Sequence, residues 1–392
     1  MEHLPLPAAP GNGAVTRHPG TAADTIVIGG GMVGASIALG LVLRGHRVTV
    51  LDEGDRALRA ARANFALLWV QSKGAGAPAY FNWSRMAAAA WPDFARQLEA
   101  MTGIVLHLSQ RGGLTLALSG AEMDHLATRS ARIACDQGSD FPHEMLDHSQ
   151  TRALLPAIGP DVVGALFSPL DGHLNALALF HALHRAFGRS GGHYVPASPV
   201  RTITPTKKGT FILDTPHGYR ECERVVLAAG LDNTRLAPMV GLHAPITPQR
   251  GQIMVTQRLP PFLDYPTNAL RQTDNGSVLI GNSQDTVMTR QPVDLEIDAV
   301  MADRAIRSFP CLQAASVVRS WSCFRVKSPD GMPVYDHSTL WPGAFVASCH
   351  SGVTLAPNHT GLVCDAIHTG IIPPIMQAFS ASRFTLTAAS RS

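Results

Sequence analysis

The stretch DTIVIGGGMVGASIALGLVLRGHRVTVLD, residues 24–52, decides the fold of this chain. Its first part, Thr25 to Ile28, is a short apolar run rich in β-branched residues, which is typical of a buried parallel strand. Gly29, Gly31 and Gly34 then form the pattern G-x-G-x-x-G. Residues 36–44 have helical spacing, and residues 47–51 form a second apolar strand that ends in Asp52. This order of strand, glycine turn, helix, strand and acid predicts a βαβ unit that binds a dinucleotide.

Each part of that unit has a physical role. Gly29 permits the tight turn, Gly31 lets the backbone approach a pyrophosphate, and Gly34 lets the helix pack closely on the strand. The start of the helix offers free N–H groups and the positive end of a dipole to the phosphates. Asp52 lies where a carboxylate accepts hydrogen bonds from an adenosine ribose.

Length and composition indicate a folded protein with a large core. The chain has 392 residues, enough for two domains or one large two-part fold, and is 45% hydrophobic and 16% charged. The net charge of +3 is small and the basic residues are scattered, which argues against a nucleic-acid partner or an anionic membrane. Residues 25–43 carry no charge, so a membrane span is the alternative there. Four glycines near its start, and Arg44 followed at once by another strand, argue for no transmembrane segment.

Metal ligands are not evident in the sequence. The six cysteines are Cys135, Cys222, Cys311, Cys323, Cys349 and Cys364, and none forms C-x-x-C or another ligand spacing, so we predict no metal site or cluster in this chain. His181 and His184 are three residues apart, but without an evident third ligand they are better explained as ordinary histidines. Scattered cysteines suit a reducing compartment. We therefore expect a cytoplasmic protein, with a peripheral place at the inner membrane left open.

Both ends of the chain are predicted to lack regular structure. Residues 1–23 are rich in Pro, Gly and Ala, which predicts a disordered extension and not a secretory signal. A similarly loose C-terminal tail is expected over residues 376–392, above all from Ser380. Between the ends, spacing predicts helices over 83–101, 121–136, 176–187, 295–307 and 360–368, and strands over 163–167, 194–203, 210–214 and 344–347. The turn Asp274-Asn275-Gly276 between residues 270–273 and 277–280 is a hairpin signature.

Two further segments are candidate walls of the dinucleotide site. Arg224 to Gly230 is an apolar strand that ends in small residues, which allow another backbone or a ligand to approach closely. Asn64 to Val70 follows the ribose-binding acid, and a loop returning to the core explains it equally well. The nucleotide-binding elements are therefore discontinuous, with a strand-rich region between them.

At this point the chain resembles the D-amino-acid oxidase, glycine oxidase and sarcosine oxidase family of FAD enzymes. It is most similar to the β subunit of heteromeric opine oxidases, D-hydroxyproline dehydrogenases and hydrogen cyanide synthases. The stretches that carry the resemblance are VIGGGMVGASIALGL, NFALLWVQSKG, LDGHLNAL, RVVLAAGLDNTRLAPMVGLHAP, PQRGQIMVTQ, FRVKSPDGMPVYD and CHSGVTLAP, which together span residue 24 to about residue 366.

The resemblance implies an α/β (α+β) fold. It has a discontinuous Rossmann-like FAD-binding domain and a second, mostly antiparallel-sheet substrate domain. We expect residues 24–105, 166–240 and 320–375 in the FAD-binding domain, and residues 106–165 and 241–319 in the substrate domain.

The resemblance also implies which residues hold FAD. The glycine turn with Met32 and Val33 takes the pyrophosphate, and Asp52 with Glu53 takes the ribose position, where Glu is usual. The remaining implied contacts come from the flavin loop, the adenine-facing backbone, the small residues after the middle strand and the last motif. They are Asn64, Phe65, Val200, Ala228, Ala229, Gly230, Arg325, Ser351, Gly352, Val353 and Thr354.

Two arginines are the candidate catalytic residues. Arg325 aligns with the arginine that binds the substrate carboxylate, a task that suits a planar guanidinium that keeps its charge. From the sequence alone, an ordinary salt bridge would be the more frequent role. Arg271 could hold a second carboxylate, as an opine needs, and a structural role is at least as frequent.

The chain also departs from the family pattern. Ala269 stands where glycine oxidase has an active-site tyrosine, which puts glycine as the substrate in doubt. Ala61 and Ala66 replace a small hydroxyl residue and a glycine of the flavin loop.

The implied function is oxidation of an amine α to a carboxylate. Hydride transfer to flavin N5 gives an imine that water hydrolyses, and D-hydroxyproline or D-proline, an opine, glycine and sarcosine all remain open as amino-acid-like substrates. The subunit resemblance implies partners, namely an α subunit and a small [2Fe–2S] subunit. The alternatives are a stand-alone oxidase that reduces O₂ to H₂O₂ and a flavoprotein scaffold without catalysis.

Overall fold

The computed structural model describes residues 23–54, 60–281, 283–284 and 293–384. Its largest sheet is built on β1 (Ala23–Ile28), which pairs in parallel with β2 (Val48–Leu51) on one side and β11 (Gly218–Leu227) on the other. Two more parallel strands extend it, β8 (His193–Val195) beside β2 and β17 (Ala344–Ser348) beside β11, and β16 (Val334–His337) closes one edge in antiparallel. The beginning, middle and end of the chain therefore share one sheet, as the sequence predicted.

The first helix, α1 (Met32–Leu43), is covered on nearly all sides, and every residue in it except Val33 is buried. It packs against the sheet, α5 (Ala176–Arg189) and a π-helical segment at His359–Val363. A Cβ on Gly40 would lie 2.3 Å from the main-chain oxygen of Thr360, so this contact needs a glycine. The charge-free run reflects burial inside the protein. Within the described part of the chain, no helix is both long and apolar enough to cross a bilayer.

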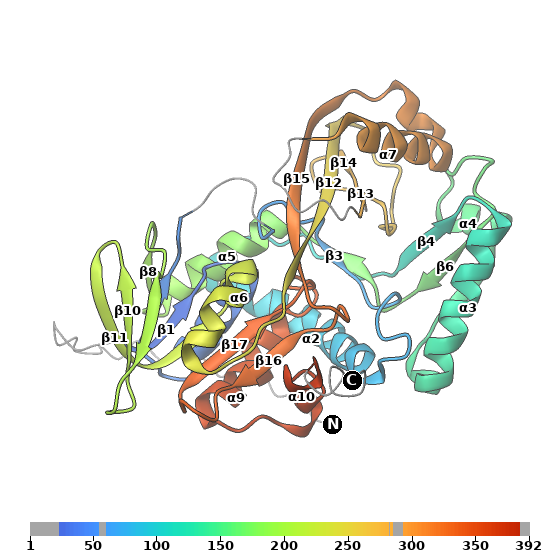
Figure 1. Ribbon diagram of the computed structural model, residues 1–392. Helices are drawn as coiled ribbons and strands as arrows, with labels where there is room; N and C mark the ends of the chain where they lie inside the picture. The colour runs from blue at the N-terminus through green and yellow to red at the C-terminus, as the bar shows by residue number, and fades with distance from the viewer. Residues whose placement is uncertain (1–22, 55–59, 282, 285–292, 385–392) are drawn as a thin grey trace.

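A second region carries the antiparallel sheets (Figure 1, upper right). One sheet has the order β13 (Leu270–Gln272), β14 (Ser277–Ile280), β12 (Thr247–Arg258) and β15 (Val317–Lys327). The other has the order β4 (Gly113–Ala117), β6 (Gly164–Ser168) and β5 (Glu144–Asp147), and a bridge between Leu114 and Thr267 links the two. The helices α3 (Gly120–Gln137), α4 (His148–Leu154) and α7 (Leu295–Ser308) belong to this region. The proposed domain limits at 165/166 and 319/320 fall inside β6 and β15, so both strands are shared between the proposed domains.

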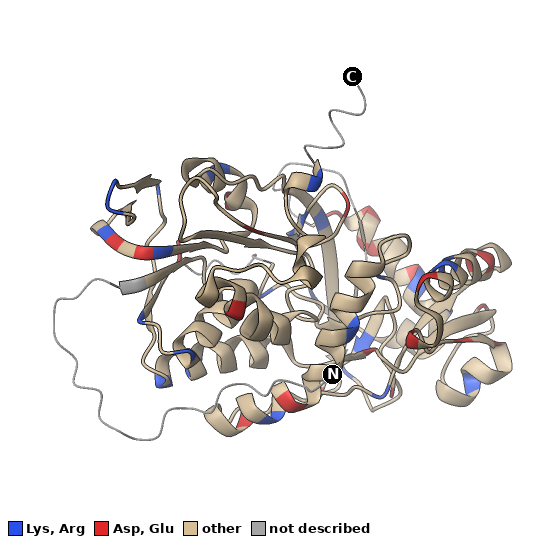
Figure 2. Cartoon of the chain, turned by 90° about the horizontal axis from the view of Figure 1, so that it is seen from below, with Lys and Arg blue, Asp and Glu red and all other residues tan. Residues whose placement is uncertain are grey.

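The remaining strands and helices complete the fold. They are β3 (Leu67–Leu68), β7 (Gly172–His173), β9 (Thr202–Pro205), β10 (Phe211–Thr215), α2 (Pro78–Thr102), α6 (Asn233–Leu236), α8 (Ala356–Asn358), α9 (Cys364–Thr369) and α10 (Pro374–Gln377). Basic and acidic residues are interspersed along the chain, in keeping with its small net charge (Figure 2).

Some sequence predictions were wrong in detail. The strand expected over 194–203 is broken into β8 and β9, because Pro196 and Pro199 cannot donate to a ladder. The helix expected over 360–368 begins as the π-helical segment at His359–Val363 and becomes α9. The tail is not loose at its start, since Phe379 is fully buried in the main core. Ala23 is already in β1, and residues 1–22 and 385–392 lie outside the described residues.

Candidate active site

The glycine turn after β1 is held by close backbone contacts. Gly29 has a φ of +101°, and a Cβ there would lie 2.5 Å from the main-chain oxygen of Ala228. A Cβ on Gly34 would lie 1.9 Å from the main-chain oxygen of Gly29, so α1 sits directly against the turn. Around Gly31 the space is open, with the Cβ of Ala61 at 4.0 Å as the nearest contact. The two tight glycines therefore shape the turn, and the third leaves room for a ligand to approach.

Asp52 connects the turn to the end of β2. Its carboxylate accepts the main-chain N–H of Gly30 at 2.6 Å and that of Gly54 at 2.9 Å, and its side chain is 8% exposed. His184 on α5 contacts the other side of the turn, with its Nε2 2.8 Å from the main-chain oxygen of Gly30. This histidine is therefore a structural contact of the turn.

A cavity of about 770 Å³ opens over this turn. Most of the predicted cofactor residues line it, namely Gly29, Gly31, Met32, Val33, Asp52, Glu53, Asn64, Val200, Ala228, Ala229, Gly230 and Gly352. They come from the beginning, middle and end of the chain. The structure thus brings the three predicted segments to one cavity.

Six predicted cofactor residues do not line the cavity: Gly34, Phe65, Arg325, Ser351, Val353 and Thr354. Gly34 packs α1 on the turn, and Val353 is part of the main core. The Thr354 hydroxyl accepts the main-chain N–H of Trp69 and donates to the main-chain oxygen of Leu67. Ser351 pairs with the Tyr80 hydroxyl at 2.9 Å. Gly34, Ser351, Val353 and Thr354 therefore have packing or hydrogen-bonding roles next to the cavity.

The predicted flavin loop, which contains Asn64, Phe65 and Ala66, has one backbone position that normally needs glycine. Ala66 has a φ of +67° and is fully buried, and its N–H donates to the side-chain oxygen of Asn64 at 2.6 Å. Ala66, which stands where the family pattern has glycine, therefore adopts a left-handed backbone conformation.

Arg325 lies beside this cavity on β15. Its Nη1 donates to the main-chain oxygens of Ser283 at 2.7 Å and Arg250 at 3.4 Å, and its guanidinium packs on Gly251. No carboxylate of the described residues lies within ion-pair distance of it. Its two sequence neighbours Phe324 and Val326 line the cavity, whereas Arg325 does not.

Arg271 shares a sheet face with Arg325. The register pairs Arg271 with Leu279, Leu279 with Val255, and Arg325 with Gln249, and alternation puts residues 249 and 255 on one face of β12. Arg271 is 5% exposed, and its Nε donates to the main-chain oxygen of Phe65. Burial lowers the pKa of Arg271 to about 10, so the side chain stays charged at neutral pH.

Three further residues near the cavity were not predicted from the sequence. His350 and Cys349 line it, and Lys73 lies behind them, with Nζ 5.8 Å from the centre of the Tyr80 ring. Burial lowers the pKa of Lys73 to about 8. The pKa of His350 is also lowered, by lost hydration and by the neighbouring cations of Arg325 and Lys73, so this ring is neutral. A signal was present, because His350 directly precedes the Ser351-Gly352 pair of the last motif.

The family model for FAD dependent oxidoreductases matches residues 24–365. The chain belongs to this family. It is 48% identical to the B subunit of opine oxidase from Agrobacterium tumefaciens (strain Ach5), and the match covers 92% of this chain and 97% of that protein. It is 46% identical to the B subunit of opine oxidase from Rhizobium meliloti, with the same coverage of 92% and 97%. Among solved structures, glycine oxidase from Geobacillus kaustophilus superposes with a TM-score of 0.83 at 26% identity, over 92% of this chain and 98% of that one.

This FAD-dependent amino acid or amine oxidoreductase has a cavity that fits its cofactor. The cradle over Gly31 would be narrowed by a side chain, and the start of α1 has no side-chain cap, so its main-chain N–H groups remain for phosphate oxygens. Asp52 is at the cavity wall, where a ribose would lie next to the pyrophosphate. The expected family, fold class and cofactor are thereby confirmed.

Proposed function

We propose that this flavoenzyme oxidises a secondary amine that lies α to a carboxylate, in a substrate of the opine type, as the catalytic β subunit of a heteromeric dehydrogenase. The observation that carries the proposal is Arg325. Its guanidinium lies beside the glycine-turn cavity, bound only to main-chain oxygens, with no acidic partner among the described residues. The near full-length similarity to two proteins named as B subunits of opine oxidase supports the same interpretation.

The charge around Arg325 favours an anionic ligand. Lys73 and Lys327 add positive potential to the same region, as their effect on the pKa of His350 shows. A planar guanidinium binds both oxygens of a carboxylate, and nearby cations add to the attraction. The same cations disfavour the protonated form of a bound amine, which must be neutral before it can be oxidised. When bound, FAD supplies the acceptor for the hydride that leaves the α-carbon.

Arg271 supports a substrate with a second carboxylate. Only its Nε has a hydrogen-bond partner among the described residues, which leaves its terminal nitrogens for a ligand. Ala269 comes two residues before it, so this chain has a small side chain where the family resemblance expects a tyrosine. An N-carboxyalkyl amino acid fits both arginines better than glycine does.

The electron acceptor in this proposal is a partner protein. The described residues contain no group of three or more His, Cys, Asp or Glu side chains that could hold a metal ion. A larger α subunit and a small [2Fe–2S] protein would take the electrons from the flavin. The names of the relatives, which mark them as parts of larger enzymes, support this arrangement.

Anaerobic bleaching of the flavin tests the reaction. Purified FAD-loaded protein is mixed with N-carboxyalkyl amino acids, D-proline, D-hydroxyproline, sarcosine and glycine, and the visible flavin band is followed by stopped flow. We expect bleaching by an N-carboxyalkyl amino acid and its loss in Arg325→Ala. Bleaching by none of these compounds, or unchanged turnover in Arg325→Ala, would contradict the proposal. Rapid peroxide formation by the isolated chain would identify a stand-alone oxidase instead.

A further inference from the structure

Lys73 places an amino group in the interior of the protein, behind the wall of the cofactor cavity. It lies in the turn before α2, where its main-chain N–H donates to the main-chain oxygen of Val70 at 2.9 Å. Gly74, with a φ of +81°, packs so closely on α2 that a Cβ would lie 2.5 Å from the Cβ of Phe81. From this tight turn the Lys73 side chain runs inward, and its Nζ lies 5.8 Å from the centre of the buried Tyr80 ring.

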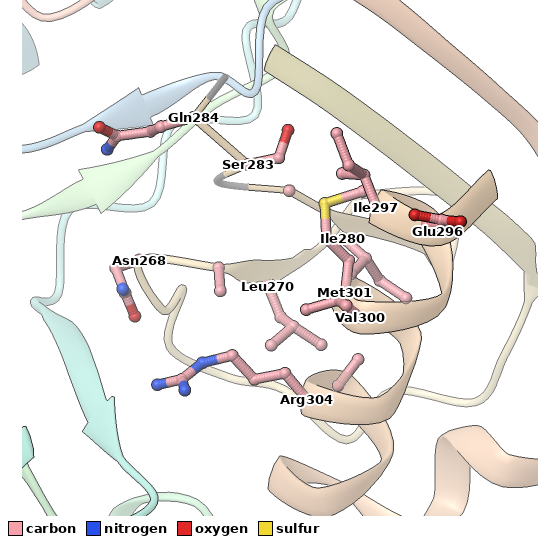
Figure 3. Close-up of a pocket in the computed structure, with 13 residues that line it drawn as sticks. Asn268, Leu270, Ile280, Ser283, Gln284, Glu296, Ile297, Val300, Met301 and Arg304 are labelled. Carbon is pink, nitrogen blue, oxygen red and sulfur yellow. The ribbon is translucent and has the colours of Figure 1, made fainter. Parts of the chain in front are cut away.

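The Lys73 ammonium has no hydrogen-bond or ion-pair partner among the residues that the structure describes. Asp171 acts on its charge, but that carboxylate already accepts two main-chain N–H groups and the side-chain amide of Gln71. Arg304 shows the usual arrangement of a cation: it lines a separate cavity of about 530 Å³ against α7 (Figure 3) and binds Glu122 at 2.8 Å. Because a buried cation without a counter-ion costs free energy, such cations are found mainly at functional sites.

The charge of Lys73 acts across the wall of the cofactor cavity. Cys349 and His350 line the cavity. Burial, and then the neighbouring cations, including Lys73, lower the pKa of the His350 ring. Burial raises the pKa of the Cys349 thiol to about 12, and Lys73 acts in the opposite direction. Ser351 of the same segment pairs with the hydroxyl of Tyr80, whose ring lies beside Lys73. A charge that forms along this wall is therefore within electrostatic reach of Lys73.

This wall is the part of the cavity that is left for the flavin ring. The glycine turn fits the pyrophosphate, and Asp52 takes the ribose of the adenosine. A Cβ on Gly352 would lie 3.4 Å from the Cβ of Met32, at the start of α1. The segment after β17 therefore flanks the pyrophosphate site. With the adenosine assigned to Asp52, the ring lies between this segment and β15.

We propose that Lys73 stabilises the negative charge that the flavin ring gains on reduction, and so raises the reduction potential of the bound FAD. A hydride adds two electrons and one proton to the neutral oxidised ring, so the reduced ring carries one negative charge unless it binds a second proton. A cation held in a low-dielectric interior stabilises that form over the oxidised form. The inference needs bound FAD, but it does not depend on which substrate is oxidised.

The reduction potential of the bound FAD tests this role. It is measured against reference dyes during slow anaerobic reduction, without substrate. Lys73→Met and Lys73→Gln remove the charge and keep most of the side-chain length. At pH 7 both variants should bind FAD and shift the equilibrium about tenfold toward the oxidised form. For a two-electron couple this is a potential about 30 mV lower. Lys208→Met, in the exposed turn between β9 and β10, is the control and should leave the potential unchanged.

The pH dependence of the potential is a second readout. Burial lowers the pKa of Lys73 to about 8, and the negative charge of the reduced ring raises it again. Above about pH 8 the wild-type protein therefore takes up a second proton on reduction, and its potential should fall about twice as steeply with pH as in Lys73→Met. The groups around Lys73 do not titrate there. Burial raises the pKa of Asp171 only to about 7, it holds the protons of Cys349 and Tyr80 at higher pH, and the His350 ring is neutral.

The possible outcomes separate this role from others. Equal potentials in the wild type and in both Lys73 variants would overturn the inference, and so would the same lowering in Lys208→Met. A raised KM at an unchanged potential would assign Lys73 to the substrate and also overturn it. If no compound of the substrate panel bleaches the flavin, the proposed function is wrong, but the potentials still decide the role of Lys73.

Discussion

Arg325 can be tested by a substitution that keeps its charge. Lysine keeps the positive charge but loses the planar pair of donors, so Arg325→Lys should raise KM for the substrate by about tenfold or more, while the bound FAD content stays the same. Steady-state kinetics with a dye acceptor and the visible flavin spectrum measure the two quantities. Arg319→Lys is the control, because Arg319 lies on the same strand and is exposed. An unchanged KM in Arg325→Lys would remove this residue from the carboxylate site.

Ala66 has a backbone conformation that is unfavourable for a residue with a Cβ atom. A non-glycine residue at a φ of +67° costs about 1–2 kcal/mol, which Ala66→Gly relieves. The lost methyl and the added chain entropy cost about as much, so the net change in the free energy of unfolding should be within about 0.5 kcal/mol. Ala63→Gly also loses a methyl and adds chain entropy, but it relieves no strain, since Ala63 is buried without a positive φ. It should lower the free energy of unfolding by about 1.5 kcal/mol. Urea unfolding measures both, and equal destabilisation would show that Ala66 is not strained.

At this scale the sequence predicts residues whose role depends on local geometry. Gly29 and Asp52 belong to one short motif, so their spacing is sufficient to place them at the cavity. His350 and Lys73 are different, because their pKa values depend on neighbours from distant segments. A pattern along the chain does not contain that information.

The βαβ unit can be tested at the contact between α1 and the glycine turn. In Gly34→Ala the new Cβ would lie 1.9 Å from the Gly29 oxygen, so the helix must move away from the turn. We expect a loss of stability of about 1–3 kcal/mol or more, and loss of bound FAD during purification. The ratio of visible to ultraviolet absorbance and thermal unfolding measure these effects.

Gly188→Ala is the matched control for that substitution. Gly188 lies in α5, and no atom is within 4 Å of a Cβ at this position. The control should gain up to about 1 kcal/mol from helix propensity and retain its FAD. Full FAD retention in Gly34→Ala would show that the close contact is not needed for binding.

Periodicity predicts long elements well and fails where several short segments meet. The helices over 121–136 and 295–307 agree with α3 and α7 within one residue at each end, because their polar and apolar faces are distinct. The helix over 360–368 was expected as plain α-helix, but its start belongs to the segment His359–Val363, which is packed against α1 and forms a π-helical turn. The main-chain N–H of Val70 donates a hydrogen bond to the carboxylate of Asp171, which directly precedes β7. This contact also joins residues that are far apart in sequence.

The whole molecule is held together by contacts between the first, middle and last thirds of the chain. The glycine motif predicts one βαβ unit, but the order of the other strands around it was not predicted from the sequence. The four-stranded sheet shows the same limit, since only its hairpin of β13 and β14 has a local signature. The cavity over the glycine turn forms where the three thirds of the chain meet, so it could not be outlined from spacing alone.

A buried network across these thirds makes the stability of the protein depend on pH. His359 is fully buried, and its Nε2 lies 2.9 Å from the Tyr335 hydroxyl, which also contacts Trp83 on α2. Burial lowers the pKa of His359 to about 3, whereas an unfolded histidine titrates near 6.5. The unfolded chain therefore binds a proton that the folded protein excludes. The contribution of His359 to the free energy of unfolding is fully present above about pH 6.5 and is lost as the pH falls toward 3. Between pH 7 and 5 this one histidine accounts for a loss of about 2 kcal/mol.

Urea unfolding at pH 7, 6 and 5 measures this dependence. The wild-type protein should lose stability steadily on acidification, and His173 adds to the loss because burial lowers its pKa to about 4. His359→Gln should be less stable at pH 7, but it should lose about 2 kcal/mol less between pH 7 and 5, since glutamine does not titrate. His125→Gln, at an exposed position on α3, should keep the wild-type slope. Equal slopes in His359→Gln and the wild type would mean that His359 is not the group that excludes the proton, and the Tyr335 contact would then have only a packing role.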